Sequence, residues 1–247
     1  MSSTTAPPSR SNAWFVTTHW SVVLSAGRSD STRARQALEG LCQTYWYPLY
    51  GYVRRRGYPP HDAQDLTQGF FACLLERQSL ANADPNKGRF RSFLLGAINH
   101  FLATERAKIQ TQKRGGGREI LSLDLAEAER RFDLEPADNA TPDKAFDKAW
   151  ATALLDKVLG QLEEEFRREQ KIHLFDALKQ TLAGPREAQP YVALASRLNM
   201  TEGAIRTAVH RLRKRYRQLL EAEIAHTVAS AEEVRDELRY LLQVVAG

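Results

Sequence analysis

Long hydrophobic runs are absent from this sequence of 247 residues. No stretch of about 18 consecutive apolar residues occurs, so no segment is predicted to cross a membrane as a helix. Residues 1–12 are mostly small and polar and lack the apolar core of a secretory signal. We therefore expect a cytoplasmic protein that has no membrane partner.

Cysteine and metal-ligand patterns are equally sparse. The two cysteines, Cys42 and Cys73, form no CxxC or CxxH motif, and their apolar surroundings predict buried thiols in a reducing compartment. The six histidines are scattered without the spacing of a metal site. No P-loop, nucleophile elbow, HExxH motif or dinucleotide-binding fingerprint occurs. These absences predict a protein that is not an enzyme and holds neither a metal nor a cofactor.

Alternating strand patterns are also nearly missing, and helical periodicity takes their place. One helix is predicted from about Thr32 to Tyr52, with Tyr45 on its apolar face. A second helix begins at Pro60, because proline suits the first turn of a helix. A third is predicted from about Phe90 to Gln112. The predicted fold is therefore all-α.

The segment from Lys113 to Asp143 interrupts this pattern. Between Glu119 and Asp143 there are 8 acidic residues and 2 basic ones, and no periodicity is sustained. We predict a flexible acidic linker over residues 113–145. Helices resume at Thr141 and Pro142, an N-cap followed by proline in the first turn. An apolar stripe then follows at Phe146, Trp150, Leu154 and Val158.

Basic charge is concentrated in two places. The net charge of the chain is +5, but residues 1–111 carry 13 basic and 7 acidic side chains. Residues 190–220 carry 7 basic side chains and 1 acidic one, whereas residues 221–247 carry 2 and 6. Two basic blocks separated by acidic sequence indicate contact with a polyanion at two separate sites.

The second basic block has the pattern of a helix-turn-helix. A short helix is predicted from Tyr191 to Leu198, followed by a turn in which Asn199 tolerates a left-handed conformation and Thr201 caps the next helix. The second helix has one apolar stripe, formed by Ile205, Val209, Leu212, Tyr216 and Leu219. One packed face and one cationic face are what a DNA-recognition helix requires.

The exposed positions of this helix are the candidate DNA-binding residues. Those near its start should face base edges in the major groove, and those further along should hold phosphates. The candidates are Thr201, Gly203, Arg206, Thr207, His210, Arg211, Arg213, Lys214 and Arg217. A solvated basic helix in an ordinary bundle is the alternative interpretation.

A further amphipathic helix is predicted near the C-terminus. Ser230 and Glu233 fit a capping box, and an apolar stripe continues through Val234, Leu238, Leu241 and Val245. This helix must cover a surface, either on its own protein or on a partner. It could also shield the basic recognition helix.

Two sets of residues together resemble a known family. The segments Arg54–Tyr58, Asp62–Phe71 and Phe90–Asn99 resemble the first conserved domain of bacterial sigma factors. The segments Tyr191–Ala195 and Arg211–Arg215 resemble their last domain. In order and spacing the chain is similar to the extracytoplasmic-function (ECF) type of the sigma-70 family.

The resemblance implies roles for residues of the first domain. The helix from Pro60 would dock on core RNA polymerase through Asp65, Gln68 and Phe71. The following loop and helix would capture and melt the −10 promoter element through Lys87, Arg89, Phe90, Arg91, Asn99, Arg106 and Lys108. Phe90 could stack on an exposed base or could equally belong to the core. The acidic linker would thread through polymerase, or serve only as a solubilising spacer.

The domain organisation follows from both arguments. We expect an aromatic N-terminal extension (1–29), a sigma region 2-like domain (30–112), the linker (113–145), a region 4-like helix-turn-helix domain that binds the −35 element (146–221), and a C-terminal helical extension (222–247). Phe93 stands where the family often has tryptophan, and Asn199 where it often has glycine. Neither replacement is physically unfavourable.

The expected function is that of a sigma factor, which binds bacterial core RNA polymerase and directs promoter-specific initiation. A stand-alone helix-turn-helix regulator, whose N-terminal domain senses a ligand or partner, is the alternative. An adaptor that sequesters another regulator is a third class. An anti-sigma protein or a regulatory kinase would be compatible with the family, and no residue selects between them.

Overall fold

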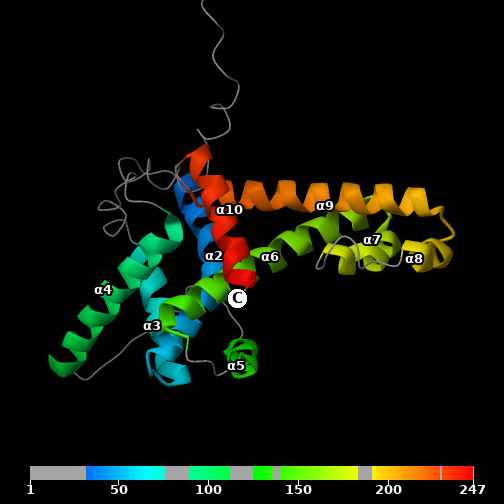
Figure 1. Cartoon of the computed structure of the whole chain (residues 1–247). Coiled ribbons are helices and arrows are strands. Elements are labelled where there is room, and N and C mark those ends of the chain that lie inside the picture. The colour runs from blue at the N-terminus through cyan, green and yellow to red at the C-terminus, as the bar shows by residue number, and fades with distance from the viewer. Residues whose placement is uncertain are drawn as a thin grey trace, which may run out of the picture. The chain divides into compact units, whose positions relative to one another are not determined.

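Helices make up nearly all of the described residues. The computed structural model describes residues 32–75, 89–111, 125–135, 140–182, 191–228 and 230–246, and no strand occurs in these ranges (Figure 1). The all-α prediction is therefore confirmed. Within the same ranges, no helix is both long enough and apolar enough to cross a membrane. The predicted N-terminal extension and Lys87 lie outside the described residues.

The described residues form two compact units. The first contains the residues up to Ala153 together with those from Ile224 onward, and the second is Leu154–Glu223. The boundary thus differs from the expected domain start at residue 146. Phe146 and Trp150 are fully buried in the first unit, where the Phe146 ring lies 6.5 Å from that of Tyr45. The expected C-terminal extension is also part of the first unit.

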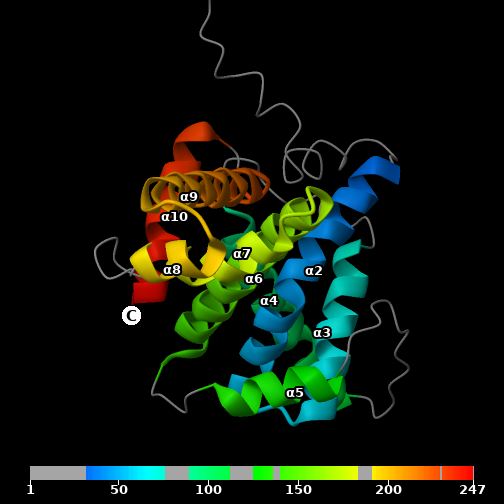
Figure 2. The ribbon, with the colours of Figure 1, turned by 90° about the vertical axis from the view of Figure 1, so that its right-hand side faces the viewer.

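Three helices begin the first unit. They are α2 (Thr32–Arg55), α3 (Pro60–Leu75) and α4 (Phe90–Thr111), and α2 and α3 lie side by side (Figure 2). Gly57 has a φ of 90° in the turn between α2 and α3, a conformation that glycine adopts without strain. Pro60 is the first residue of α3, as predicted.

The Cys73 side chain on α3 is exposed, so the prediction that its thiol is buried is wrong.

The predicted linker contains a helix that docks on α2. This helix, α5 (Leu125–Leu134), brings Glu129 to Arg54, with 2.8 Å between Nε and Oε1, and Glu129 also accepts a hydrogen bond from Tyr50. The guanidinium carbon of Arg54 lies over the ring of Phe132, 4.6 Å from the ring centre. The prediction of a flexible linker over residues 113–145 is therefore wrong for the residues of α5. Acidic and aromatic side chains of this helix bind the arginine side chains at the end of α2.

The start of α6 (Pro142–Arg168) and the whole of α10 (Ala231–Ala246) also belong to the first unit. The helix α6 begins with Thr141 as its cap, whose Oγ1 lies 3.4 Å from the backbone nitrogen of Lys144. The helix α10 begins with the predicted capping box, in which Ser230 and Glu233 bond each other's backbone N–H groups. Both starts confirm the capping predictions, because capping depends on residues only three apart.

The second unit is built around one apolar cluster. It comprises part of α6, then α7 (Ile172–Leu178), a 3₁₀ turn η2 (Lys179–Leu182), α8 (Tyr191–Leu198) and most of α9 (Glu202–Ala225). The buried members of the cluster are Leu162, Phe175, Leu178, Ala195, Ile205, Val209 and Leu212. This core fixes α9 against α8, which sets the position of the basic face of α9.

Candidate nucleic-acid interface

The turn between α8 and α9 has the predicted geometry. Asn199 has a φ of 51°, in the left-handed region that asparagine tolerates better than most residues. Thr201 Oγ1 accepts a hydrogen bond of 3.2 Å from the backbone N–H of Ala204, which caps α9. The turn and the cap together determine where α9 begins and which of its faces packs.

One face of α9 is packed, as the apolar stripe predicted. Ile205, Val209 and Leu212 are buried in the core of the second unit, and Tyr216 and Leu219 are half-buried against it. Burying each large aliphatic side chain contributes about 1.5–3 kcal/mol, so this face anchors the helix firmly.

The opposite face of α9 is exposed and cationic. It presents Gly203, Arg206, Thr207, His210, Arg211, Lys214 and Arg217 to solvent. Arg206 pairs with Glu202, and Arg217 pairs with Glu221 at 2.8 Å. Exposed pairs of this kind contribute only about 0.3–0.5 kcal/mol each. A phosphate can therefore replace either carboxylate at little cost.

Three groups on this face have no internal partner. Within the described ranges, His210, Arg211 and Lys214 make no ion pair or side-chain hydrogen bond. They are available to a ligand without the loss of an internal contact. Thr207 donates a hydrogen bond of 3.0 Å to the carbonyl oxygen of Gly203, as helical threonines commonly do.

Arg213 does not belong to the exposed face. Its Nε and Nη2 donate hydrogen bonds of 3.0 and 2.6 Å to the carbonyl oxygen of Thr181, at the end of η2. The side chain is half-buried, and its two hydrogen bonds satisfy a carbonyl group near the end of a helical segment. Its assignment to DNA is therefore corrected to a packing role. The position four residues after the buried Val209 was the available signal, since i and i+4 share a face.

Arg215 also has an internal role, which sequence reasoning did not assign. Its Nε donates to Glu165 Oε2 on α6 at 2.8 Å. The hydrogen bond from Arg215 holds the pKa of Glu165 below its ordinary value, against the opposing effect of burial. The pair joins α6 to α9 inside the second unit.

The first basic block is different, because the start of α4 is covered. Phe90 is fully buried, its ring centre lies 5.1 Å from that of Tyr45, and its N–H donates to the Thr227 carbonyl at 3.0 Å. The ring is therefore not available to stack on a base in this structure. Of the two alternatives for Phe90, the core position is the one observed.

Arg91 is likewise internal. Its Nε donates to Glu237 Oε1 of α10 at 2.6 Å, its Nη1 donates to Asp147 Oδ1 at 2.8 Å, and its guanidinium lies 4.1 Å from the ring centre of Tyr240. Burial lowers the pKa of Arg91, but the hydrogen bond and charge of Glu237 outweigh burial, so the pKa is raised. Arg89 pairs with the same Glu237 at 2.9 Å. The predicted phosphate contact of Arg91 is therefore wrong for this conformation.

A different basic surface remains open beside α4. Asn99 Oδ1 accepts hydrogen bonds of 2.8 Å from Tyr52 Oη and from Arg56 Nη1. Arg106 is exposed, and its guanidinium lies over the Tyr58 ring, whose hydroxyl accepts a hydrogen bond from Arg106 Nε at 2.6 Å. We call these four groups, Arg56, Tyr58, Asn99 and Arg106, the α2–α4 surface. Arg56 was not singled out from the sequence, and the side chain of Lys108 lies outside the described residues.

The predicted polymerase-binding residues divide between the surface and the core. Asp65 is exposed on α3 and lies 3.3 Å from His61 Nδ1, and Gln68 is half-buried. Phe71 is fully buried, so it supports α3 from inside and its assignment to the docking surface is corrected. The periodicity of Ala63, Phe70 and Leu74 was the signal that this side of α3 faces the core.

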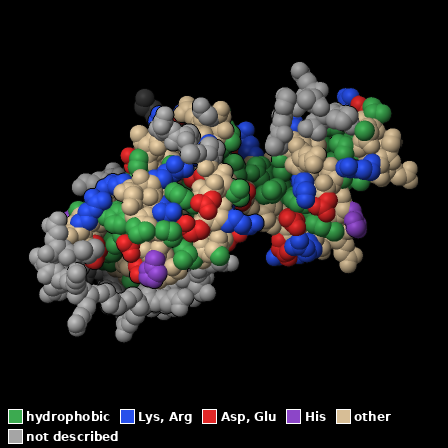
Figure 3. Space-filling model, turned by 90° about the horizontal axis from the view of Figure 1, so that it is seen from below, with side chains coloured by type: hydrophobic (Ala, Val, Ile, Leu, Met, Phe, Trp, Pro, Cys, Tyr) green, Lys and Arg blue, Asp and Glu red, His purple; other side chains and the backbone are tan. Residues whose placement is uncertain are grey.

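Charges of both signs lie close together on the molecule. On the face seen in Figure 3, Lys and Arg side chains adjoin Asp and Glu side chains in several places.

No cluster of three or more potential metal ligands occurs among the residues that are described. The chain matches no protein-family model, no curated protein and no solved structure. The candidate interface is therefore defined by its own geometry: a capped, anchored helix whose exposed face is cationic.

Proposed function

We propose that this chain is a sigma factor, which binds bacterial core RNA polymerase and directs it to promoters. The main observation behind the proposal is the basic face of α9. His210, Arg211 and Lys214 make no ion pair or side-chain hydrogen bond with a described residue, and the opposite face of the helix packs in the core. This face suits the phosphates and base edges of a −35 element. The resemblance of the α3 and α4 segments to sigma factors extends the proposal from DNA binding to initiation.

The −10 part of the proposal needs other residues than those first predicted. Phe90 and Arg91 are internal, whereas Arg56 and Arg106 of the α2–α4 surface are exposed and its Tyr58 and Asn99 are half-buried. Its Tyr58 ring and Asn99 amide add an aromatic face and hydrogen-bonding atoms, the groups used to hold unpaired bases. We assign contact with the −10 strand to this surface.

The polymerase arm is tested by co-elution with bacterial core RNA polymerase at moderate salt. The wild-type chain is expected to co-elute and to produce transcripts from fixed start sites. The double substitution Asp65→Ala with Gln68→Ala should weaken association without unfolding the chain. Asp176→Ala with Gln180→Ala removes the same residue types from exposed positions of the second unit and is the matched control.

The DNA arm is tested on a promoter fragment. Arg211→Ala with Lys214→Ala should lower affinity and reduce the slope of log K against log salt by about 0.9 for each lost phosphate contact. Lys171→Ala with Lys179→Ala removes two exposed lysines outside α9 and should change neither quantity. Arg206→Ala should relax preference at one base pair, with a loss of about 1–3 kcal/mol of discrimination. Unchanged selectivity would contradict base reading by Arg206.

The burial of Phe90 and Arg91 favours one competing function. A stand-alone regulator would bind duplex DNA through α9 and would not need to melt a promoter. Tight binding to duplex DNA with no association to core polymerase would replace the sigma-factor proposal by this one.

A further inference from the structure

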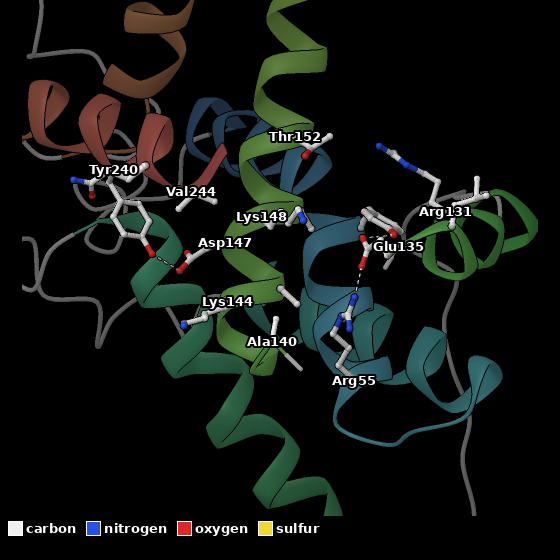
Figure 4. A pocket seen from close by; sticks show the side chains of 15 residues that line it. Arg55, Arg131, Glu135, Ala140, Lys144, Asp147, Lys148, Thr152, Tyr240 and Val244 are labelled. Carbon is white, nitrogen blue, oxygen red and sulfur yellow. Dashed lines mark hydrogen bonds and ion pairs between the residues drawn. The ribbon is translucent and has the colours of Figure 1, made fainter. Parts of the chain in front are cut away.

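A cavity of about 850 Å³ lies in the first unit, and none of its lining residues belongs to the two proposed DNA surfaces. Its walls come from α2 and α5 on one side and from α10 on the other, and α6 runs between them (Figure 4). This volume lies in the range of about 300–1,000 Å³ that small-molecule sites occupy. The cavity therefore has the size to hold a compact organic ligand.

The carboxylates that line the cavity are already neutralised. Glu135 accepts hydrogen bonds of 2.8 Å from Arg55 and 2.7 Å from Tyr47. Asp147 accepts one of 2.8 Å from Arg91 and another from Tyr240, as the dashed lines in Figure 4 show for the residues drawn. Neither carboxylate is available to pair with the lysines of the cavity.

Two lysines that line the cavity have no oppositely charged partner among the described residues. Lys144 and Lys148 are exposed on α6 and have no ion pair with any described residue. The Cβ atoms at positions i and i+4 of a helix lie about 5–6 Å apart, so these two long, flexible side chains can converge on one anion. A phosphate held by both side chains would pair with two positive charges that have no ion pair among the described residues.

The rest of the lining suits an organic body attached to that phosphate. Leu134 is 76 % exposed, the highest fraction among the large hydrophobic side chains described, and it borders the cavity. Val244 lies on the opposite wall. Arg131 places its guanidinium 4.6 Å from the ring centre of Tyr47, which adds a flat, polarisable surface. A molecule with an apolar or aromatic part would cover these groups.

We propose that this cavity binds a small organic phosphate of the nucleotide class. The phosphate lies between Lys144 and Lys148, and the base or other apolar part lies toward Leu134 and the Arg131–Tyr47 pair. Because the ligand touches α5, α6 and α10 together, binding stabilises the docked positions of α5 and α10 by mass action. The inference goes beyond the proposed function and stands whether or not the chain binds polymerase.

The first test is a titration of the full chain with fluorescent mant-ADP. Saturable binding is expected, and Lys144→Gln with Lys148→Gln should weaken it at least about tenfold, since each lost charged contact is worth more than a neutral one. Lys171→Gln with Lys179→Gln is the charge-matched control and should bind as the wild type does. Inorganic pyrophosphate should compete more weakly than ADP, because it lacks the organic body.

A second readout separates this cavity from the basic DNA surfaces. Addition of ADP should slow hydrogen exchange in residues 125–134 and 231–246, and the Lys144/Lys148 double variant should not show this protection. The proposal is overturned by absence of saturable binding up to millimolar ADP, or by equal loss of binding in the control variant. It is also overturned if the Lys144/Lys148 substitutions weaken duplex DNA binding instead, which would make the cavity a nucleic-acid surface.

Discussion

The two basic regions of this protein look alike as sequence and differ as structure. On α9, Arg211 and Lys214 are exposed and have no partner among the described residues. At the start of α4, Arg89 and Arg91 converge on Glu237, a carboxylate whose side chain is 1 % exposed and which lies 146 residues from Arg91 in the chain. Positive charge in a sequence thus indicates where anions can be held, but not whether the anion comes from DNA or from the protein itself.

The largest effect on the free energy of unfolding is expected from a substitution in the buried ion-pair cluster at the start of α4. Glu237→Ala leaves Arg91 buried without its main partner, which should lower the free energy of unfolding by about 3–5 kcal/mol. Glu202→Ala removes only the exposed partner of Arg206 and should cost at most about 1 kcal/mol. Urea unfolding of both variants checks the comparison. Similar losses of unfolding free energy in the two variants would contradict the difference in burial between the start of α4 and the exposed face of α9.

A second prediction separates two neighbours on α9. Arg213→Ala removes two hydrogen bonds to the Thr181 carbonyl and should destabilise the protein by about 1–3 kcal/mol. Lys214→Ala should change stability by no more than about 0.5 kcal/mol and should lower affinity for DNA. Thermal unfolding and DNA titration are measured on both variants. Reduced DNA affinity with unchanged stability for Arg213→Ala would restore its role as a phosphate contact.

A third prediction concerns pH and the docking of α5. Burial raises the pKa of Glu129, but hydrogen bonds from Arg54 and Tyr50 outweigh burial and bring the pKa below its ordinary 4.5. The ionised carboxylate therefore stabilises the fold above pH 4.5, and this contribution is lost as the pH falls through the lowered pKa. Glu129→Gln should cost about 1 kcal/mol at neutral pH and progressively less in acid.

The measurement for Glu129 is the difference in unfolding free energy between wild type and variant across that range. Glu127→Gln, on the same helix but paired with Arg130 at an exposed site, is the control. A difference for Glu129→Gln that stays constant into acid would show that its charge does not hold α5 on α2.

The smallest expected effect is at Gly203, which tests the open face of α9. A Cβ atom added there meets nothing within 4 Å, so Gly203→Ala should raise stability by roughly 0.5 kcal/mol through reduced backbone entropy of the unfolded chain. If the position faces base edges, the added methyl group should weaken DNA binding at the same time. Higher stability with unchanged DNA affinity would place Gly203 away from the groove.

Local features of the fold were predictable because they depend on neighbouring residues. The start of α3 at Pro60, the cap at Thr141 and the left-handed turn at Asn199 each follow from a few adjacent residues, and all three are observed. The apolar stripes of α6 and α9 were likewise readable from helical spacing. Both kinds of signal are properties of a single helix and its ends.

Contacts between distant segments were not predictable in the same way. The docking of Glu129 on Arg54 joins residues 75 apart, and the bonds of Arg213 to Thr181 join residues 32 apart. Helical spacing gives the face on which such a residue lies, but not the element that packs against that face. The linker was therefore expected to be free of structure, and Arg213 was assigned to the wrong partner.

The sequence by itself determined an all-helical fold, the first residues of most helices and the packed face of α9. Only the tertiary structure decided which arginines are exposed, since Glu237, Asp147 and Thr181 reach their partners through folding. It also created the cavity beside Lys144 and Lys148, which is lined by residues of four helices. The physical reason is that helix formation depends on local backbone and capping energies, whereas the exposure of a charge depends on what the rest of the chain packs against it.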